Sequence, residues 1–340
     1  MHNKTLRSAA LLALLLAFIV VMLGAYTRLS DAGLGCPDWP GCYGRLVLPS
    51  GGQELQQAQT QFPQIPIEAR KAWTEMVHRY AAGTLAVLIF FIGFTVWYKR
   101  YQGQKEPWII PSLLMLLVVF QAALGMWTVT LKLLPVVVMG HLLGGMLIFA
   151  GLARFSMQMS SAPAADLPQW RPWLRLGVLI VFLQIALGGW VSSNYAGIAC
   201  IGFPTCNGMW LPTLHFAKGF NLFSAVGANY QGGLLDNEAR VTIQFIHRVG
   251  AVMTAVYVSV LALLILRSRS RLGPTVKDAF SRAAKLLIIL VLIQFALGVI
   301  NVEFMLPIQV AVAHNGVAAL LLATMFSMLH CVSGRKSHAN

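Results

Sequence analysis

Eight long apolar segments dominate this 340-residue sequence. Each is long enough to cross a hydrocarbon layer about 30 Å thick, which takes about 20 helical residues. Only 11% of the residues are charged, whereas a soluble domain typically has about 25%. The sequence therefore predicts an all-α integral membrane protein with eight transmembrane helices and excludes an ordinary soluble domain, a coiled coil and a disordered chain. The predicted spans are 8–27, 73–98, 107–129, 135–158, 172–194, 241–266, 282–304 and 306–331.

Lysine and arginine are unevenly distributed over the connecting loops. An even number of spans puts both termini on one side, and that side carries sixteen of the 25 basic residues against seven on the other. Cytoplasmic loops are enriched in Lys and Arg, so both termini are predicted to be cytoplasmic, with the long loops 28–72 and 195–240 outside. No Arg-rich, Ser-rich leader precedes the first span, which favours a bacterial inner membrane; a cleaved signal peptide is the alternative interpretation of that span.

The second half of the sequence repeats features of the first. Three blocks recur at offsets of 164, 169 and 173 residues. They are the pair Cys36 and Cys42 with Cys200 and Cys206, the dipeptide His78-Arg79 with His247-Arg248, and the segment Gln121 to His141 with Gln294 to His314. Four helices per half would give both halves the same orientation, so we expect a parallel tandem repeat of two pseudosymmetric four-helix bundles, 1–160 and 161–340.

Four of the eight histidines lie within predicted spans at matched positions, namely His78, His141, His247 and His314. Ionisable residues inside a membrane are rare and usually functional, although one histidine alone can be a hydrogen-bonded packing residue. Two imidazoles per half are too few for zinc, which usually takes four ligands. A haem iron needs only axial ligands. The histidines therefore predict two bis-histidine haem sites, and nearby glycines would admit a flat macrocycle or simply close helix packing. These glycines are Gly83, Gly140, Gly144, Gly145, Gly250 and Gly316.

Charged residues accompany the histidines. Arg79 and Arg248 each follow one, and either a haem propionate or the lipid headgroups would satisfy such a guanidinium. Glu75 lies three residues before His78 and on the same helix face, whereas Gln244 occupies the matched position in the second half. A carboxylate beside one haem can act as a general base or stabilise a developing positive charge. A favourable charge near a helix N-terminus is the alternative.

Each long outer loop contains a C-x5-C pair, Cys36 with Cys42 and Cys200 with Cys206. Thiols outside the cytoplasmic membrane tend to be oxidised, so we expect a disulfide within each loop. Each disulfide would serve as a loop clamp or take part in redox chemistry. Cys331 lies outside this pattern and has no assigned role.

In their joint order and spacing, Glu75-x-x-His78-Arg79, His141, Gln244-x-x-His247-Arg248, His314 and the cysteine pairs resemble the haem A synthase family over nearly the whole chain. The resemblance implies a haem b cofactor held by His247 and His314, and a haem O substrate near His78 and His141. It also implies oxidation of a porphyrin methyl group to a formyl group, giving haem A for cytochrome oxidase. Glu75 matches the catalytic acidic position of the family, and Cys36 and Cys42 match its outer-loop disulfide. The candidate partners, besides membrane lipid, are haem O synthase, cytochrome oxidase assembly factors and a second copy of the chain; no nucleic acid is expected.

Three other functions fit parts of the pattern. A bis-histidine transmembrane b-type cytochrome passing electrons from quinol would need the same four histidines but no specific role for Glu75. A transporter built on a parallel repeat would place Gln121, Gln184 and Gln294 along a path, although the spans offer few charges to couple transport. A structural subunit of a larger complex would leave the histidines unexplained. The sequence identifies neither the electron acceptor nor the source of oxygen.

Overall fold

The computed structural model describes residues 4–63, 65–160 and 164–333. Eight helices in these ranges are long and apolar enough to cross a membrane, as predicted. They are α1 (Lys4–Leu29), α3 (Ala69–Tyr101), α4 (Ile109–Thr130), α5 (Pro135–Met159), α6 (Arg171–Ser193), α8 (Asn237–Arg267), α9 (Pro274–Glu303) and α10 (Ile308–Cys331). The connections contain α2 (Gly52–Gln61), α7 (Phe216–Gly219) and the 3-10 turns η1 (Pro168–Trp170) and η2 (Arg269–Arg271). The predicted all-α membrane fold is confirmed.

Helix α9 begins eight residues before the span predicted for it. Its first turn starts at Pro274, after Gly273 in an extended conformation. Proline at the first helical position lacks only an N–H that would have no intrahelical partner there. The early turns carry Lys277 and Arg282, so hydropathy alone does not detect them. The helix therefore extends beyond its apolar segment.

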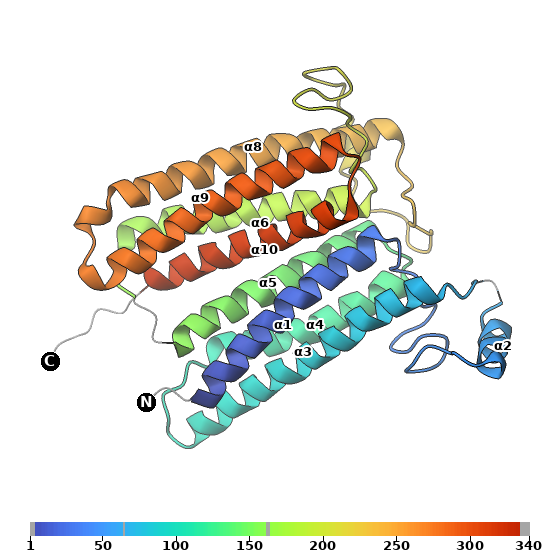
Figure 1. Ribbon diagram of the computed structural model, residues 1–340, viewed down its shortest axis with the longest axis horizontal. Helices are drawn as coiled ribbons and strands as arrows, with labels where there is room; N and C mark the ends of the chain where they lie inside the picture. The colour runs from blue at the N-terminus through green and yellow to red at the C-terminus, as the bar shows by residue number, and fades with distance from the viewer. Residues whose placement is uncertain (1–3, 64, 161–163, 334–340) are drawn as a thin grey trace.

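The eight long helices pack in two groups of four (Figure 1). Helices α1, α3, α4 and α5 pack against one another, as do α6, α8, α9 and α10, and the groups meet where α5 contacts α6 and α10 and where α1 contacts α10. Helix α1 begins and helix α10 ends at the same end of the helices (Figure 1). A symmetry relation between the groups stays a prediction, and the expected boundary at 160/161 borders residues outside the described ranges.

The outer turns of the two halves share a local backbone geometry. Left-handed conformations, which L-amino acids other than glycine rarely adopt, recur at four pairs of positions matched by the repeat. The pairs are Asp31 with Tyr195, Tyr43 with Asn207, Lys132 with Met305 and Leu133 with Leu306, and their φ angles lie between 47° and 64°. The repeated blocks therefore correspond to repeated turns.

Helices α5 and α10 occupy the centre of the molecule. Helix α5 packs against α1, α4, α6 and α10, and α10 packs against α1, α5, α6 and α9. Their buried side chains include Leu152 and Phe155 on α5 and Leu322 and Met325 on α10, all in the main apolar core. One histidine of each predicted pair thus sits on a central helix.

Polar contacts join the two halves at both ends of the helices. At the end with the long loops, Arg28 of α1 donates to the Tyr195 hydroxyl over 2.7 Å and to the Ser192 carbonyl over 2.6 Å. At the other end, the segment between the halves pairs with the end of α10, since the Ala165 N–H donates to the Cys331 carbonyl over 2.8 Å. The halves are thus held together by more than apolar packing.

Helix α2 is not predicted from the apolar segments, because its sequence is polar. Its sequence consists mainly of glutamine, glutamate, leucine and alanine, which are good helix formers. Ala58 is buried in a small cluster with Cys36, Cys42 and Tyr43. The buried Ala58 and the bonds from Arg45 to Glu54 and Gln57 hold this helix on the first disulfide loop. Hydrophobic periodicity does not reveal contacts of this kind.

Candidate functional site

The first histidine pair lies in the first helix group, with one histidine on each of two helices. His78 is on α3 and His141 on α5, and their ring centroids are 6.4 Å apart with an interplanar angle of 86°. Two imidazole nitrogens on opposite sides of one metal ion, each about 2 Å from it, put the ring centroids roughly 6 Å apart. The spacing therefore suits a single metal ion between the two rings.

The second pair comes from the equivalent helices of the other group. His247 is on α8 and His314 on α10. Each ring nitrogen facing a neighbouring helix meets a glutamine. The Gln184 Nε2 lies 3.0 Å from His247 Nδ1, and the Gln294 Nε2 lies 3.1 Å from His314 Nε2.

Each of the four histidines packs against a glycine on a neighbouring helix. A Cβ added at Gly24 would lie 2.9 Å from His78 Cε1, and one at Gly188 would lie 3.2 Å from His247 Cε1. Gly125 and Gly298 stand in the same relation to the other two histidines, each at 3.3 Å. The missing side chains let the imidazoles reach the helix backbone. The repeat offsets of these glycines, 164 and 173 residues, are the signal that could have linked them to the histidines.

The glycines that the sequence places near a macrocycle have mixed surroundings. Gly144 and Gly250 lie directly under the amides of Gln121 and Gln184, and Gly316 lies under the Met22 sulfur. Gly145, one turn after His141, has open space where a Cβ would be. Gly83 is likewise open, and Leu124 lies 3.9 Å from a Cβ added at Gly140.

The donor set fits a haem better than a bare metal ion. Within the described residues, no group of three or more His, Cys, Asp and Glu side chains is arranged to hold a metal. The Nδ1 atoms of His78, His141 and His314 are buried without a hydrogen-bond partner. A pair of imidazoles provides two ligands, which suits an iron that already has four porphyrin nitrogens. The open space beside Gly145 would admit a flat group.

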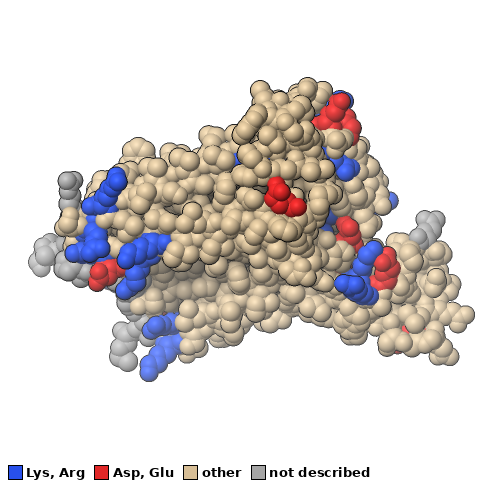
Figure 2. Space-filling model, turned by 45° about the horizontal axis from the view of Figure 1, so that its top comes forward, with Lys and Arg blue, Asp and Glu red and all other residues tan. Residues whose placement is uncertain are grey.

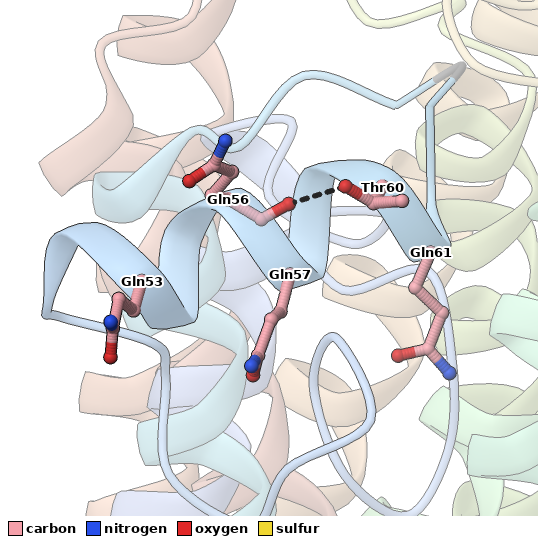
Figure 3. A pocket seen from close by; sticks show the side chains of 5 residues that line it. All are labelled: Gln53, Gln56, Gln57, Thr60 and Gln61. Atoms are coloured by element: carbon pink, nitrogen blue, oxygen red, sulfur yellow. Dashed lines mark hydrogen bonds between the residues drawn. The ribbon is translucent and has the colours of Figure 1, made fainter.

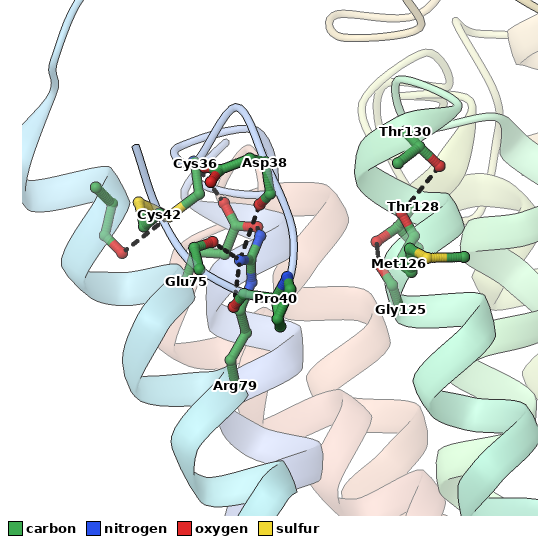
Figure 4. A network of polar contacts seen from close by, with 12 residues as sticks. Cys36, Asp38, Pro40, Cys42, Glu75, Arg79, Gly125, Met126, Thr128 and Thr130 are labelled. Carbon is green, nitrogen blue, oxygen red and sulfur yellow. Dashed lines mark hydrogen bonds and ion pairs between the residues drawn. A yellow bond between two sulfur atoms is a disulfide. The ribbon is translucent and has the colours of Figure 1, made fainter. Parts of the chain in front are cut away.

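Glu75 is buried between α3 and the first disulfide loop, with 4% of its surface exposed. Its Oε2 accepts the Cys36 backbone N–H over 2.9 Å, and its Oε1 accepts from the Arg79 Nη2 over 2.5 Å (Figure 4). The predicted i,i+3 relation to His78 holds, because both residues are in the same helix. The carboxylate is thus fixed one turn from a histidine of the first pair.

Arg79 holds the first disulfide loop onto α3. Its Nη1 donates to the backbone carbonyls of Asp38, Pro40 and Gly41 over 3.0, 3.2 and 2.5 Å (Figure 4). The anionic partner expected for this guanidinium is therefore present within the chain, as Glu75. In this structure Arg79 acts as a clamp between the helix and the loop.

Arg248 makes the matching clamp in the second half. It donates to the carbonyls of Gly202 and Thr205 over 2.8 and 3.0 Å, and also to the Cys200 carbonyl. Gln244, in place of the carboxylate, is buried, and its Oε1 has no hydrogen-bond partner. Of the two matched positions, the one in the first half therefore carries an ionisable group and the one in the second half does not.

Both expected disulfides are present. Cys36 is bonded to Cys42 and Cys200 to Cys206, with a Cα–Cα distance of 4.8 Å in each case. All four cysteines are buried. Cys331 is a free, buried thiol at the end of α10.

A glutamine-lined hollow lies on α2, away from the histidines. Its lining residues are Gln53, Gln56, Gln57, Thr60 and Gln61 (Figure 3). Thr60 bonds the Gln56 carbonyl of its own helix over 2.8 Å. None of these side chains titrates or binds metals well, so the hollow is not a candidate for chemistry.

The fold and the site together define a class: a polytopic membrane protein with two matched histidine pairs suited to tetrapyrrole iron, one of them beside a buried glutamate. The chain belongs to the cytochrome oxidase assembly protein family COX15-CtaA, whose family model matches residues 7–326. It is 42% identical to the heme A synthase of Shewanella oneidensis over 93% of both chains. It is also 30% identical to the heme A synthase of a Chelativorans species over 90% of this chain and 84% of that one.

Proposed function

We propose that the chain is a membrane oxidoreductase that oxidises a methyl group of haem O to a formyl group, giving haem A for cytochrome oxidase. Family membership and the 42% identity to a heme A synthase support this function. The observation that carries it is the difference between the halves. One histidine pair has a buried glutamate one turn away, whereas the other has a glutamine at the matched position.

We assign the two histidine pairs different occupants. His247 and His314 would be the axial ligands of a resident haem b, in a half with no ionisable group at the Glu75 position. His78 and His141 would bind the iron of the substrate, haem O. A bound haem b supplies one-electron redox chemistry, which the side chains here cannot provide. The two halves, 1–160 and 161–340, would thus be a substrate half and a cofactor half.

Glu75 is the proposed catalytic residue. Its carboxylate would accept a proton, or stabilise a developing positive charge, at the edge of the substrate. The Cys36 N–H and the Arg79 guanidinium hold both carboxylate oxygens and so fix its direction. The disulfide loop would therefore act on the reaction by positioning this carboxylate.

Arg79 and Arg248 are candidates to contact haem propionates in addition to clamping their loops. The Arg248 Nε is buried without a partner and is a donor free for such a contact. Arg79 follows His78 directly, so a propionate reaching it would share the guanidinium with Glu75. Arginine suits this role because it can bind carboxylates with two parallel hydrogen bonds.

The charge distribution supports a bacterial inner-membrane location with both termini in the cytoplasm. Lys and Arg outweigh Asp and Glu at the end of the helices where α1 begins and α10 ends, while acidic and basic residues are both prominent at the opposite end (Figure 2). Cytoplasmic ends are typically basic, which puts the disulfide loops outside. Haem O synthase, cytochrome oxidase assembly factors and a second copy of the chain remain candidate partners in that membrane.

Haem extraction and chromatography test the proposed function. Wild type and Glu75→Gln would be purified from cells that supply haem O. Haem A, or its hydroxylated precursor, is expected in wild type and its loss in the variant, with haem b retained by both. A transmembrane b-type cytochrome is the rival function, since it needs the same histidines. Two haem b per chain in both proteins, with no haem A, would favour that rival and refute the proposal.

A further inference from the structure

Both histidines of the second half face the amide of a glutamine. The Gln184 Nε2 lies 3.0 Å from His247 Nδ1 and 3.0 Å from the His247 carbonyl oxygen. Its Oε1 is buried without a partner, and a half-turn of the amide would bring this oxygen to Nδ1–H at the expense of the bond from Nε2 to the His247 carbonyl. The Gln294 amide faces the other ring nitrogen of its histidine, with its Nε2 3.1 Å from His314 Nε2. Each imidazole thus has a polar side chain that can fix its tautomer and ring direction.

Neither histidine of the first half has such a partner. The residue matched to Gln184 is Val20, whose apolar side chain cannot form a hydrogen bond with His78. The residue matched to Gln294 is Gln121, but its Nε2 is buried without a partner. The Nδ1 atoms of both histidines in this half are unpaired, as is the Nδ1 of His314 in the second half, so only His247 has a polar side chain at Nδ1.

The difference extends to the residues that surround the glutamines. Gly250 leaves room for the Gln184 amide, because a Cβ there would overlap Oε1. The residue matched to Gly250 in the first half is Ala81, and the residue matched to Gln184 there is the apolar Val20. The two halves therefore differ at two matched positions, with Gln184 and Gly250 in the second half and Val20 and Ala81 in the first.

The second glutamine shows the same dependence on its neighbour. In the first half Gln121 turns its amide onto Gly144, where a side chain would collide with it. The residue matched to Gly144 is Val317, which carries a side chain where Gly144 has none. Gln294 instead reaches His314. We infer that glycine or valine at this position decides whether the glutamine amide turns toward the helix backbone or toward the histidine.

We propose that Gln184 is a positioning residue that holds His247 as a permanent iron ligand, and that Val20 leaves the matched His78 free to release a tetrapyrrole. This inference rests on the proposed function, in which one half keeps its haem and the other exchanges haem for product. Metal-bound imidazoles usually donate their second N–H to a fixed acceptor, and removing that acceptor typically weakens metal binding about 10- to 100-fold. The first half lacks this acceptor where exchange is needed.

Haem release tests the first part of the proposal. Protein loaded with haem b to two per chain would be mixed with excess apomyoglobin, and haem transfer followed by absorbance. Wild type is expected to lose haem in a fast and a slow phase. Gln184→Leu is expected to accelerate the slow phase about 10-fold. Gln309→Leu, the same change at an exposed position of α10, is expected to match wild type.

The midpoint potential of the retained haem separates positioning from helix packing. An acceptor on the second imidazole nitrogen raises the basicity of the ligand. Gln184→Leu is therefore expected to raise the potential, and Gln184→Glu, with a stronger acceptor, to lower it. A glutamine that only joins α6 to α8 would not give shifts of opposite sign. Gln184→Glu also keeps the test open if the leucine variant does not fold.

The reciprocal variant Val20→Gln/Ala81→Gly installs the second-half arrangement in the first half. Its fast phase of haem release is expected to slow about 10-fold, with the slow phase unchanged. A single phase in wild type, or unchanged phases and potentials in the Gln184 variants, would overturn the inference. That failure differs from a failure of the proposed function, in which wild type makes no haem A whatever its release kinetics.

Discussion

Four glycines set how closely the membrane histidines approach their neighbouring helices. Gly24 is the tightest case, since a Cβ there would lie 2.9 Å from His78 Cε1. Real Cβ atoms essentially never come that close to another heavy atom. The imidazole would have to move, and axial ligation tolerates little displacement of the ring.

Gly24→Ala is therefore expected to lower haem binding by the first half about 10-fold and to leave the second half unchanged. The magnitude is that typical of a disturbed ligand environment. Gly52→Ala is the control, because a Cβ at the start of α2 meets nothing within 4 Å. A spectroscopic titration with haem b measures both variants. Equal affinities would contradict the steric role of Gly24.

Arg79 and Glu75 form the most enclosed ion pair described here, with 13% and 6% of their side-chain surfaces exposed. Breaking a buried pair by removing one partner costs roughly 3 kcal/mol or more. Arg79→Gln is thus expected to lower the unfolding temperature in detergent by several degrees.

Arg45→Gln provides the matched comparison for that change. Arg45 pairs with Glu54 over 2.7 Å in the same loop region, but both side chains are about 40% exposed. Exposed pairs typically contribute at most about 1 kcal/mol. Similar losses of thermal stability in the two variants would argue against a clamping role for Arg79.

The disulfide loops are the elements that connect the outer surface to the buried site. The Cys36 N–H donates a hydrogen bond directly to the Glu75 carboxylate. In the second half, Arg248 donates to the Cys200 carbonyl, and the Gln244 side-chain oxygen has no hydrogen-bond partner. An arginine therefore holds each loop on its helix, but only the first loop also hydrogen-bonds a carboxylate beside a histidine pair.

Replacing both Cys36 and Cys42 by serine is expected to reduce haem A formation at least several-fold, because the loop that orients Glu75 becomes freer. The same replacement of Cys200 and Cys206 is expected to reduce it less. Loss of either short cross-link should cost roughly 2 kcal/mol of stability. Chromatography of extracted haem and thermal unfolding measure the two effects. Equal losses of product would contradict a specific link from the first loop to Glu75.

The helices and the histidines could be predicted from sequence because each rests on a strong periodic or repeated signal. Long apolar segments fix the spans. The repeated His-Arg dipeptide identifies His78 and His247, and the repeated segment that begins with glutamine identifies His141 and His314. Other features depend on side-chain direction across neighbouring helices, which spacing along one chain does not specify. The turn of Gln184 toward His247, the turn of Gln121 toward Gly144 and the docking of α2 are of this kind.

At the scale of the whole molecule, the positive end of the helices predicts which loops face the cell exterior. Phe223→Cys, at a position 93% exposed in the second long loop, is expected to react with a membrane-impermeant thiol reagent in intact cells. Tyr101→Cys, at a position 90% exposed at the opposite end of α3, should react only after lysis. Background is low, because Cys331 is buried and the other cysteines are bonded. The reverse labelling pattern would invert the proposed topology.

The division of the molecule into a half that keeps haem and a half that converts it is the central claim. Haem content of two double variants, purified from cells that make haem b but no haem O, tests it most directly. Wild type and His78→Ala/His141→Ala are expected to retain one haem b per chain with a low-spin bis-imidazole signal, and His247→Ala/His314→Ala to retain none. Retention by the last variant, or equal loss from both variants, would contradict the claim.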